Sequence, residues 1–143
     1  MSVLRYALVP LMVVASAAAA ENFPEARNTQ PETAPFTTPA QALAKLKLPK
    51  GFHATLFAAE PDVRQPIAMT FDTRGRMWVA ENYTYAEQPL RFDRTQNDRI
   101  IVLEDADGDG QAEKRTVFYD QLQGLTSVET GFGGVWAARD GLP

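Results

Sequence analysis

The stretch IAMTFDTRGRMWVAEN, residues 67–82, decides the fold of this chain. Two apolar runs, residues 67–72 and 77–82, stand on either side of the polar sequence Thr73-Arg74-Gly75-Arg76. The runs have the length and composition of strands, and the glycine suits the positive φ that tight turns need. This pattern predicts two antiparallel strands joined by a turn.

Three further runs predict strands, because each is rich in β-branched or aromatic residues. They cover residues 52–58, 99–104 and 115–119. The hairpin pattern then recurs, because aligning Trp78 with Trp136 places Ile67 over Leu125, Gly75 over Gly133, Met77 over Val135 and Ala80 over Ala138. A repeat that holds four strands is typical of one β-propeller blade. The chain is therefore predicted to be all-β, a partial β-propeller with about one four-stranded blade and the start of the next. A β-sandwich is the alternative.

Residues 1–20 have the features of a signal peptide. Arg5 supplies a positive charge, residues 7–19 form a short apolar core, and Ala18 and Ala20 are the small residues before a cleavage point. A membrane span needs about 20 strongly apolar residues, so no stable span is expected. The prediction is export to the periplasm or the extracellular space, with membrane association only if the signal stays uncleaved.

Residues 21–38 are predicted to be a disordered linker, because they combine prolines and polar residues with few large apolar ones. Residues 39–50 are predicted to hold a short helix that begins after the N-cap Thr38. Residues 51–143 are then the N-terminal fragment of the propeller domain. The net charge of −4 and the absence of a basic cluster argue against nucleic acid as a partner. Because the chain has no cysteine, packing and metal binding must stabilise an exported domain without disulfides.

The sequence DADGDG, residues 105–110, places three carboxylates on alternate residues before a glycine, as loops that wrap a hard cation do. The predicted calcium ligands are Asp105, Asp107, Asp109, the backbone carbonyl of Gln111, and Glu113. Thr116 stands where a sensor loop has a bidentate glutamate, so the expected affinity is weak, about 10⁻⁴ to 10⁻³ M. Strands flank the loop, which indicates a bracing role for the ion. The alternative is a solvated acidic turn.

The connection over residues 83–98 is long and dense in aromatic, acidic and guanidinium groups, which is common in functional loops. In an antiparallel blade it falls on the face opposite the acidic loop. Tyr83 and Tyr85 are candidates for stacking a planar cofactor, and Arg91 and Arg94 for pairing with its carboxylates. The alternative is that the charged groups form surface ion pairs and the tyrosines pack the blade.

Four runs together carry a resemblance to a known family: PIAMTFD at residues 66–72, GRMWVAENYTY at 75–85, DRI at 98–100 and KRTVF at 114–118. They resemble the N-terminal part of the planctomycete-type membrane-bound dehydrogenases. That resemblance implies a propeller similar to those of the sorbosone and soluble glucose dehydrogenases, which use pyrroloquinoline quinone. It also implies a sugar or alcohol as substrate and, in many members, a c-type haem domain downstream.

The chain departs from that family in two ways. Quinone-dependent dehydrogenases of this shape rely on a histidine base, whereas His53 is the only histidine here and lies in the predicted outermost strand. A haem-attachment motif needs cysteines, which are absent. The catalytic residues are therefore unknown, and the base is expected outside this chain. The prediction is an N-terminal fragment of an exported quinoprotein-like dehydrogenase that is inactive alone and, with unpaired strand edges, marginally stable or prone to aggregate. The alternative is a non-catalytic, calcium-braced propeller module that binds carbohydrate or protein in the cell envelope.

Overall fold

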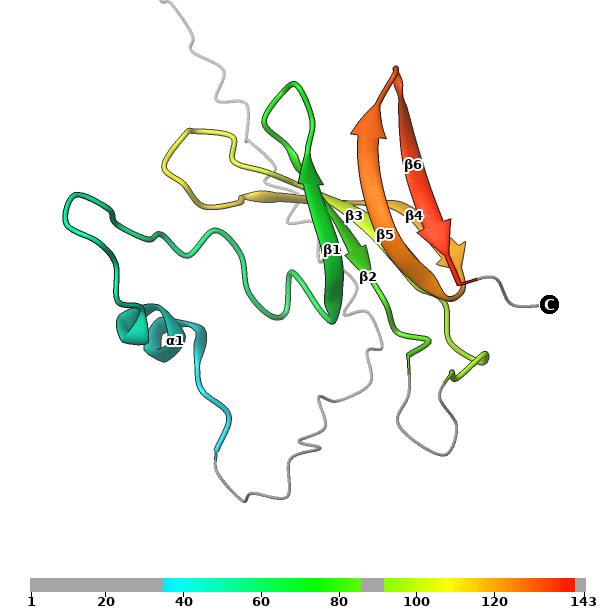
Figure 1. Ribbon diagram of the computed structural model, residues 1–143, viewed down its shortest axis with the longest axis horizontal. Coiled ribbons are helices and arrows are strands. Elements are labelled where there is room, and N and C mark those ends of the chain that lie inside the picture. The colour runs from blue at the N-terminus through cyan, green and yellow to red at the C-terminus, as the bar shows by residue number, and fades with distance from the viewer. Residues whose placement is uncertain (1–34, 86–91, 141–143) are drawn as a thin grey trace, which may run out of the picture. The chain divides into compact units, whose positions relative to one another are not determined.

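A computed structural model describes residues 35–85 and 92–140 of the chain. All its elements belong to the unit Thr37–Pro143, which is mostly β. In chain order they are α1 (Pro39–Lys45), β1 (Pro66–Phe71), β2 (Met77–Glu81), β3 (Asp98–Glu104), β4 (Lys114–Leu122), β5 (Leu125–Gly131) and β6 (Gly134–Arg139). Strands β1 to β4 form one antiparallel sheet in sequential order, and β5 pairs with β6 in a separate hairpin (Figure 1). The predicted fold class is confirmed.

Helix α1 is fixed at its start by a capping box. The Thr38 hydroxyl accepts a hydrogen bond from the Gln41 backbone N–H, and the Gln41 side chain accepts one from the Thr38 N–H. Pro39 occupies the first turn, where its missing N–H removes no helical bond. None of the helical residues is buried. The caps rather than packing therefore define this helix, and Thr38 is its N-cap, as the sequence predicted. The predicted signal peptide and residues 21–34 of the predicted linker lie outside the described residues.

The four-stranded sheet buries apolar side chains on both faces. On one face the buried residues are Trp78, Ala80, Ile100 and Val102, which pack with Leu125 and Val128 of the hairpin. On the other face Val79, Ile101 and Leu103 are covered by side chains from the connections, including Phe57, Val63 and Ala112. A strand that is buried on both faces is apolar at successive positions rather than at alternate ones. This explains the continuous apolar runs of β2 and β3.

The prediction of a strand over residues 52–58 is wrong. This segment forms no strand and leads as an irregular connection from α1 toward β1 (Figure 1). The Phe57 carbonyl accepts a hydrogen bond of 2.9 Å from the Ala112 N–H, and the Phe57 and Ala58 side chains pack over the sheet. Its apolar residues cover a face of the sheet instead of extending an edge. His53 is exposed in this segment.

The two hairpins repeat one another with a single offset. Each has a register shift at the start of its first strand, between Pro66 and Ala68 and between Leu125 and Ser127. The sequence alignment predicted that Leu125 takes the place of Ile67. In the structure Pro66 pairs with Glu81 as Leu125 pairs with Arg139, so Leu125 takes the place of Pro66 instead. The cause is the length of the turn. Residues 72–76 lie between the paired residues Phe71 and Met77, whereas the shorter segment 131–134 lies between the equivalent pair, Thr130 and Val135.

Candidate metal site and buried carboxylate cluster

The loop between β3 and β4 brings four carboxylates together. One ligand oxygen from each of Asp105, Asp107, Asp109 and Glu113 lies within 4.8 Å of all the others. Calcium binds oxygen at about 2.3–2.6 Å, so two ligands on opposite sides of the ion are about 4.8 Å apart. The spacing and the hard oxygen donors therefore fit a cation of this kind. Asp105 is half-buried and the other three are exposed.

Backbone hydrogen bonds hold the carboxylates in this arrangement. The Asp105 carboxylate accepts from the N–H groups of Gly108 at 2.6 Å and Gly110 at 2.9 Å. Both glycines have left-handed φ values, +82° and +90°, which residues with a Cβ rarely adopt. Glu113 closes the loop by accepting from the Ala106 N–H at 2.7 Å. The spacing of acids and glycines in the sequence therefore produces a closed acidic loop.

The acidic loop is tied to the sheet at its C-terminal end. Lys114 forms a 2.7 Å ion pair with Glu104, and this hydrogen bond holds the pKa of the Glu104 carboxyl below its usual value. The Glu113 N–H donates to the Glu104 carbonyl at 3.1 Å, which continues the β3–β4 pairing to the edge of the loop. The Ala112 N–H bonds Phe57, as noted above. A ligand of the loop would therefore act on β3, on β4 and on residues 52–58.

The four loop carboxylates carry like charges at close range. Among residues 35–85 and 92–140, none of Asp105, Asp107, Asp109 and Glu113 forms an ion pair. Two unit charges at about 4.8 Å repel by about 1 kcal/mol in water. A bound cation would remove this repulsion. The predicted ligand Gln111 lies in the same loop, where its side-chain amide donates to Asp109 at 3.0 Å.

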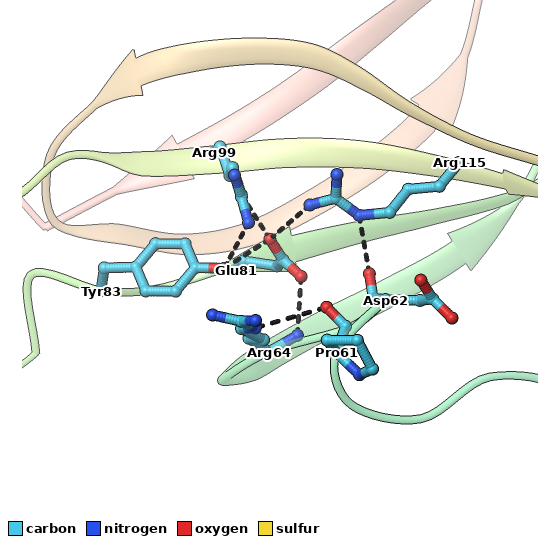
Figure 2. Close-up of polar contacts among 7 residues, drawn as sticks. All are labelled: Pro61, Asp62, Arg64, Glu81, Tyr83, Arg99 and Arg115. Atoms are coloured by element: carbon cyan, nitrogen blue, oxygen red, sulfur yellow. Dashed lines mark hydrogen bonds and ion pairs between the residues drawn. The ribbon is translucent and has the colours of Figure 1, made fainter. Parts of the chain in front are cut away.

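A second polar site, which the sequence reasoning missed, surrounds the buried carboxylate of Glu81 (Figure 2). Glu81 ends β2 and its side chain is 0% exposed. One oxygen accepts from the Tyr83 hydroxyl and from Arg99 Nε, both at 2.6 Å, and the other accepts from the Arg64 backbone N–H at 2.7 Å. The Arg115 guanidinium is 3.7 Å away. The ladder pairs Glu81 directly with Arg99, and this pairing depends on the strand register rather than on a local sequence motif.

Groups of the chain itself hold the Glu81 carboxylate on several sides. The Arg99 guanidinium also lies over the Tyr83 ring, 5.1 Å from its centroid. Burial raises the pKa of Tyr83 well above its usual value, and the hydrogen bond to Glu81 raises it further. Arg115 is anchored by a 2.7 Å hydrogen bond from its Nε to the Asp62 carbonyl. The arrangement is that of a structural ion cluster that joins β2, β3 and β4 to the segment before β1.

The predicted cofactor-binding residues have different environments. Tyr83 belongs to the Glu81 cluster. Tyr85 is exposed and meets Phe92 edge to face, with ring centroids 6.3 Å apart. Arg94 is exposed, and its backbone carbonyl accepts from the Gln123 side chain at 2.9 Å. Arg91 lies outside the described residues. The structure thus directs the two tyrosines to different partners.

An open polar cavity of about 520 Å³ lies where β3 begins and where β4 and β6 end. Its lining residues are Asn97, Asp120, Gln121, Gln123 and Arg139. Gln123 is held in place by hydrogen bonds to the carbonyls of Arg94 and Gln96. The lining offers carboxamide, carboxylate and guanidinium groups, so it suits a polar ligand.

The model of the family described as "Domain of unknown function (DUF7133)" matches residues 38–141. The chain belongs to the DUF7133 family. Neither the curated proteins nor the solved structures gave a match. The matched range begins at the helix cap Thr38 and includes all the strands of the described residues, so the acidic loop and the Glu81 cluster both lie within it. No helix in the described ranges of the chain is long and apolar enough to cross a membrane.

Proposed function

We propose that this DUF7133 domain is a calcium-braced β-propeller module of an exported protein. The observation that supports the proposal is the convergence, in the loop that joins β3 to β4, of four carboxylates that form no ion pair with the described residues. Calcium accepts six to eight oxygen ligands in flexible geometry, so backbone carbonyls and water can complete a site of this kind. Magnesium requires a stricter octahedral arrangement, which an exposed loop is less suited to impose.

The bracing role follows from what the acidic loop contacts. The ion would remove the repulsion among the carboxylates and fix the acidic loop. Ala112, in the same loop, is hydrogen-bonded to Phe57, so the ion would also hold residues 52–58 against the sheet face of Val79 and Ile101. An ion that binds only the folded state, present at one hundred times its dissociation constant, stabilises that state by about 2.7 kcal/mol. Such a contribution is substantial in a domain that has no disulfide.

The test is thermal unfolding of the whole chain in EDTA and in millimolar calcium. We expect calcium to raise the melting temperature, magnesium to raise it less, and Asp107→Asn to remove most of the calcium response. Asp120→Asn is the matched control, because it makes the same change at an exposed aspartate outside the acidic loop. Equal melting temperatures in EDTA and calcium, or an undiminished response in Asp107→Asn, would refute the proposal.

The polar cavity favours a binding role for the module, with a carbohydrate of the cell envelope as the ligand. Carboxamide and carboxylate groups hydrogen-bond sugar hydroxyls in both the donor and the acceptor sense. Titration calorimetry with soluble oligosaccharides tests this role. Gln121→Ala should weaken binding, whereas Gln111→Ala, which makes the same change in the acidic loop, should not. Absence of heat with every oligosaccharide would count against the role.

Dehydrogenase activity is proposed on the sequence resemblance alone, as a property of a complete quinone-dependent propeller that oxidises a sugar or alcohol. The resemblance also suggests a downstream c-type haem domain as an electron acceptor. Titration of pyrroloquinoline quinone into the native calcium-loaded protein, followed by absorbance, tests the cofactor. A saturable change supports it, and a strictly linear response at all concentrations argues against it.

Export is proposed from the N-terminal sequence. A mature protein recovered from the periplasm or the medium should begin at Glu21. Recovery of the unprocessed N-terminus in the membrane fraction would instead indicate an uncleaved anchor.

A further inference from the structure

The packing of the hairpin on the sheet shows how one repeat docks on another. Leu125 and Val128 of β5 lie against Trp78, Ala80, Ile100 and Val102 of the sheet. One half of this contact is the first strand of a hairpin, and the other half is the sheet face that carries the tryptophan of the preceding repeat. We call the apolar residues of the first strand, here Leu125 and Val128, the insert. We call the tryptophan-bearing face, here that of Trp78, the receiver.

The chain holds a second insert that is uncovered. The ladders pair Met69 with Val79 and Val128 with Ala137, which makes Met69 the equivalent of Val128 in the first hairpin. Val128 is 4% exposed, whereas Met69 is 66% exposed. Phe71, two residues along the same strand face, is also exposed. The first insert, Met69 and Phe71, is thus an apolar pair without a covering sheet among the described residues.

The chain also holds a second receiver. Trp136 is the equivalent of Trp78, because the ladders pair Trp78 with Thr70 and Trp136 with Glu129. Trp78 is 6% exposed under the hairpin, and Trp136 is 61% exposed. Neighbouring Val135 packs toward the core, so Trp136 lies on the opposite face of the hairpin.

The free insert and the free receiver lie on opposite sides of the unit. Met69 shares the sheet face of Val79, which is the face away from the hairpin, and Trp136 lies on the hairpin face away from the sheet. They cannot meet within one copy without unpacking the hairpin. We propose that they meet between copies: the Met69–Phe71 face of one chain packs on the Trp136 face of a second chain, in the way that β5 packs on the sheet.

A contact between two different surfaces is head to tail, and it produces rings or open chains rather than a twofold dimer. This property allows a sharp test. In sedimentation velocity or light scattering of the whole chain, the mass should rise with concentration. Met69→Lys and Trp136→Lys should each reduce the mass to that of the monomer, with unchanged circular dichroism.

Mixing the two variants should restore a one-to-one dimer and nothing larger, because Met69→Lys keeps the receiver and Trp136→Lys keeps the insert. Tyr119→Lys is the matched control, an exposed aromatic on β4 outside both surfaces, and it should associate like the parent. The proposal is overturned by a parent chain that stays monomeric, by a mixture that fails to dimerise, or by loss of association in Tyr119→Lys to the same extent.

Discussion

At the scale of single residues, Glu81 is a buried charge that groups from several elements hold in place. Its carboxylate is fully buried and is held by the Arg99 guanidinium, the Tyr83 hydroxyl and the Arg64 N–H. A buried ion pair contributes little net stability compared with apolar packing, but removing one partner leaves the other charge uncompensated. A change of one member of the Glu81 cluster should therefore reduce the stability of the fold far more than the loss of a surface ion pair would.

Glu81→Gln should lower the free energy of unfolding by about 3–5 kcal/mol, because the buried Arg99 and the half-buried Arg115 would lose the Glu81 charge. Urea denaturation measures the loss. Glu60→Gln, the same change at an exposed glutamate, is the control and should stay within about 0.5 kcal/mol of the parent. A loss below about 1 kcal/mol at Glu81 would show that water reaches the cluster.

Asp72 is a second residue with a defined electrostatic role, in the turn between β1 and β2. Its carboxylate accepts from Trp78 Nε1 at 3.0 Å and from Arg76 Nε at 2.7 Å. The Trp78 bond, followed by the Arg76 bonds, holds the pKa of Asp72 far below its usual value. A carboxyl with a depressed folded-state pKa stabilises the protein above its unfolded pKa, and that contribution is lost as the pH falls.

Asp72→Asn should therefore lower stability near neutral pH and flatten the fall in stability between about pH 5 and pH 2. Chemical denaturation at a series of pH values measures both effects. Carbon-detected NMR titration of the Asp72 carboxyl in the parent provides the direct check. An ordinary midpoint near pH 4 in that titration would contradict the assignment.

At the scale of elements, the turn of the β5–β6 hairpin contains one residue that suits its backbone conformation and one that does not. Both central residues have positive φ, +52° at Phe132 and +77° at Gly133, as two-residue hairpin turns require. Glycine adopts this conformation readily, but a bulky residue does so with strain. Phe132 is also fully exposed, so its ring gains nothing from packing in the monomer.

Phe132→Asn should raise the free energy of unfolding by about 1 kcal/mol, because asparagine tolerates the left-handed region and strain of this kind is of that order. The midpoint of urea unfolding measures the gain. Phe132→Val is the opposing variant, since a β-branched residue fits the turn less well, and it should destabilise. Equal stability of the two variants would show that the turn is not strained.

The elements were predictable where the signal is local. The capping residues of α1 and the apolar runs of both hairpins lie close together in the sequence, and the structure has them as predicted. Residues 52–58 were mispredicted because alternating apolar residues serve equally for a paired strand and for an extended segment laid over a face. The end of β4 was also missed, since Leu122 joins the ladder only through its pairing with Asp98.

The same contrast separates the two polar sites. The acidic loop was predictable because its carboxylates lie within nine consecutive residues and the glycines that fold it stand among them. The Glu81 cluster was missed because its members come from β2, β3, β4 and the segment before β1. Only the strand register brings Glu81 opposite Arg99, and register depends on the whole sheet.

At the scale of the whole unit, one buried network fastens the hairpin to the sheet. Asp98 accepts from the Thr84 N–H, from the Thr84 hydroxyl and from the Leu125 N–H, at 2.7, 2.9 and 2.7 Å. Asn82 donates to the Leu125 carbonyl at 2.7 Å. Hydrogen bonds to a buried carboxylate are stronger than neutral ones. This network fixes the start of β5 against the sheet, and the apolar packing of Leu125 and Val128 adds to the contact.

Asp98→Ala should separate the unfolding of the hairpin from that of the sheet. The Thr84 and Leu125 N–H groups would lose a buried acceptor, at a cost of about 1–3 kcal/mol each. Hydrogen exchange should then become faster at β5 and β6 while β2 and β3 stay protected. Asp93→Ala removes an aspartate from the same connection without touching the hairpin and serves as the control. Uniform acceleration across all strands would indicate a single cooperative unit.

The unequal burial of the two tryptophans gives the molecule an intrinsic optical readout. Trp78 is enclosed by the sheet, the hairpin and the Phe118 ring, whereas the Trp136 indole faces solvent. Their fluorescence should therefore differ in colour, with a blue-shifted emission from Trp78 and a red-shifted one from Trp136. Iodide will quench mainly Trp136. Spectral changes confined to the red component would report events on the outer surface of the hairpin, and a shift of the blue component would report opening of the sheet, both without a label.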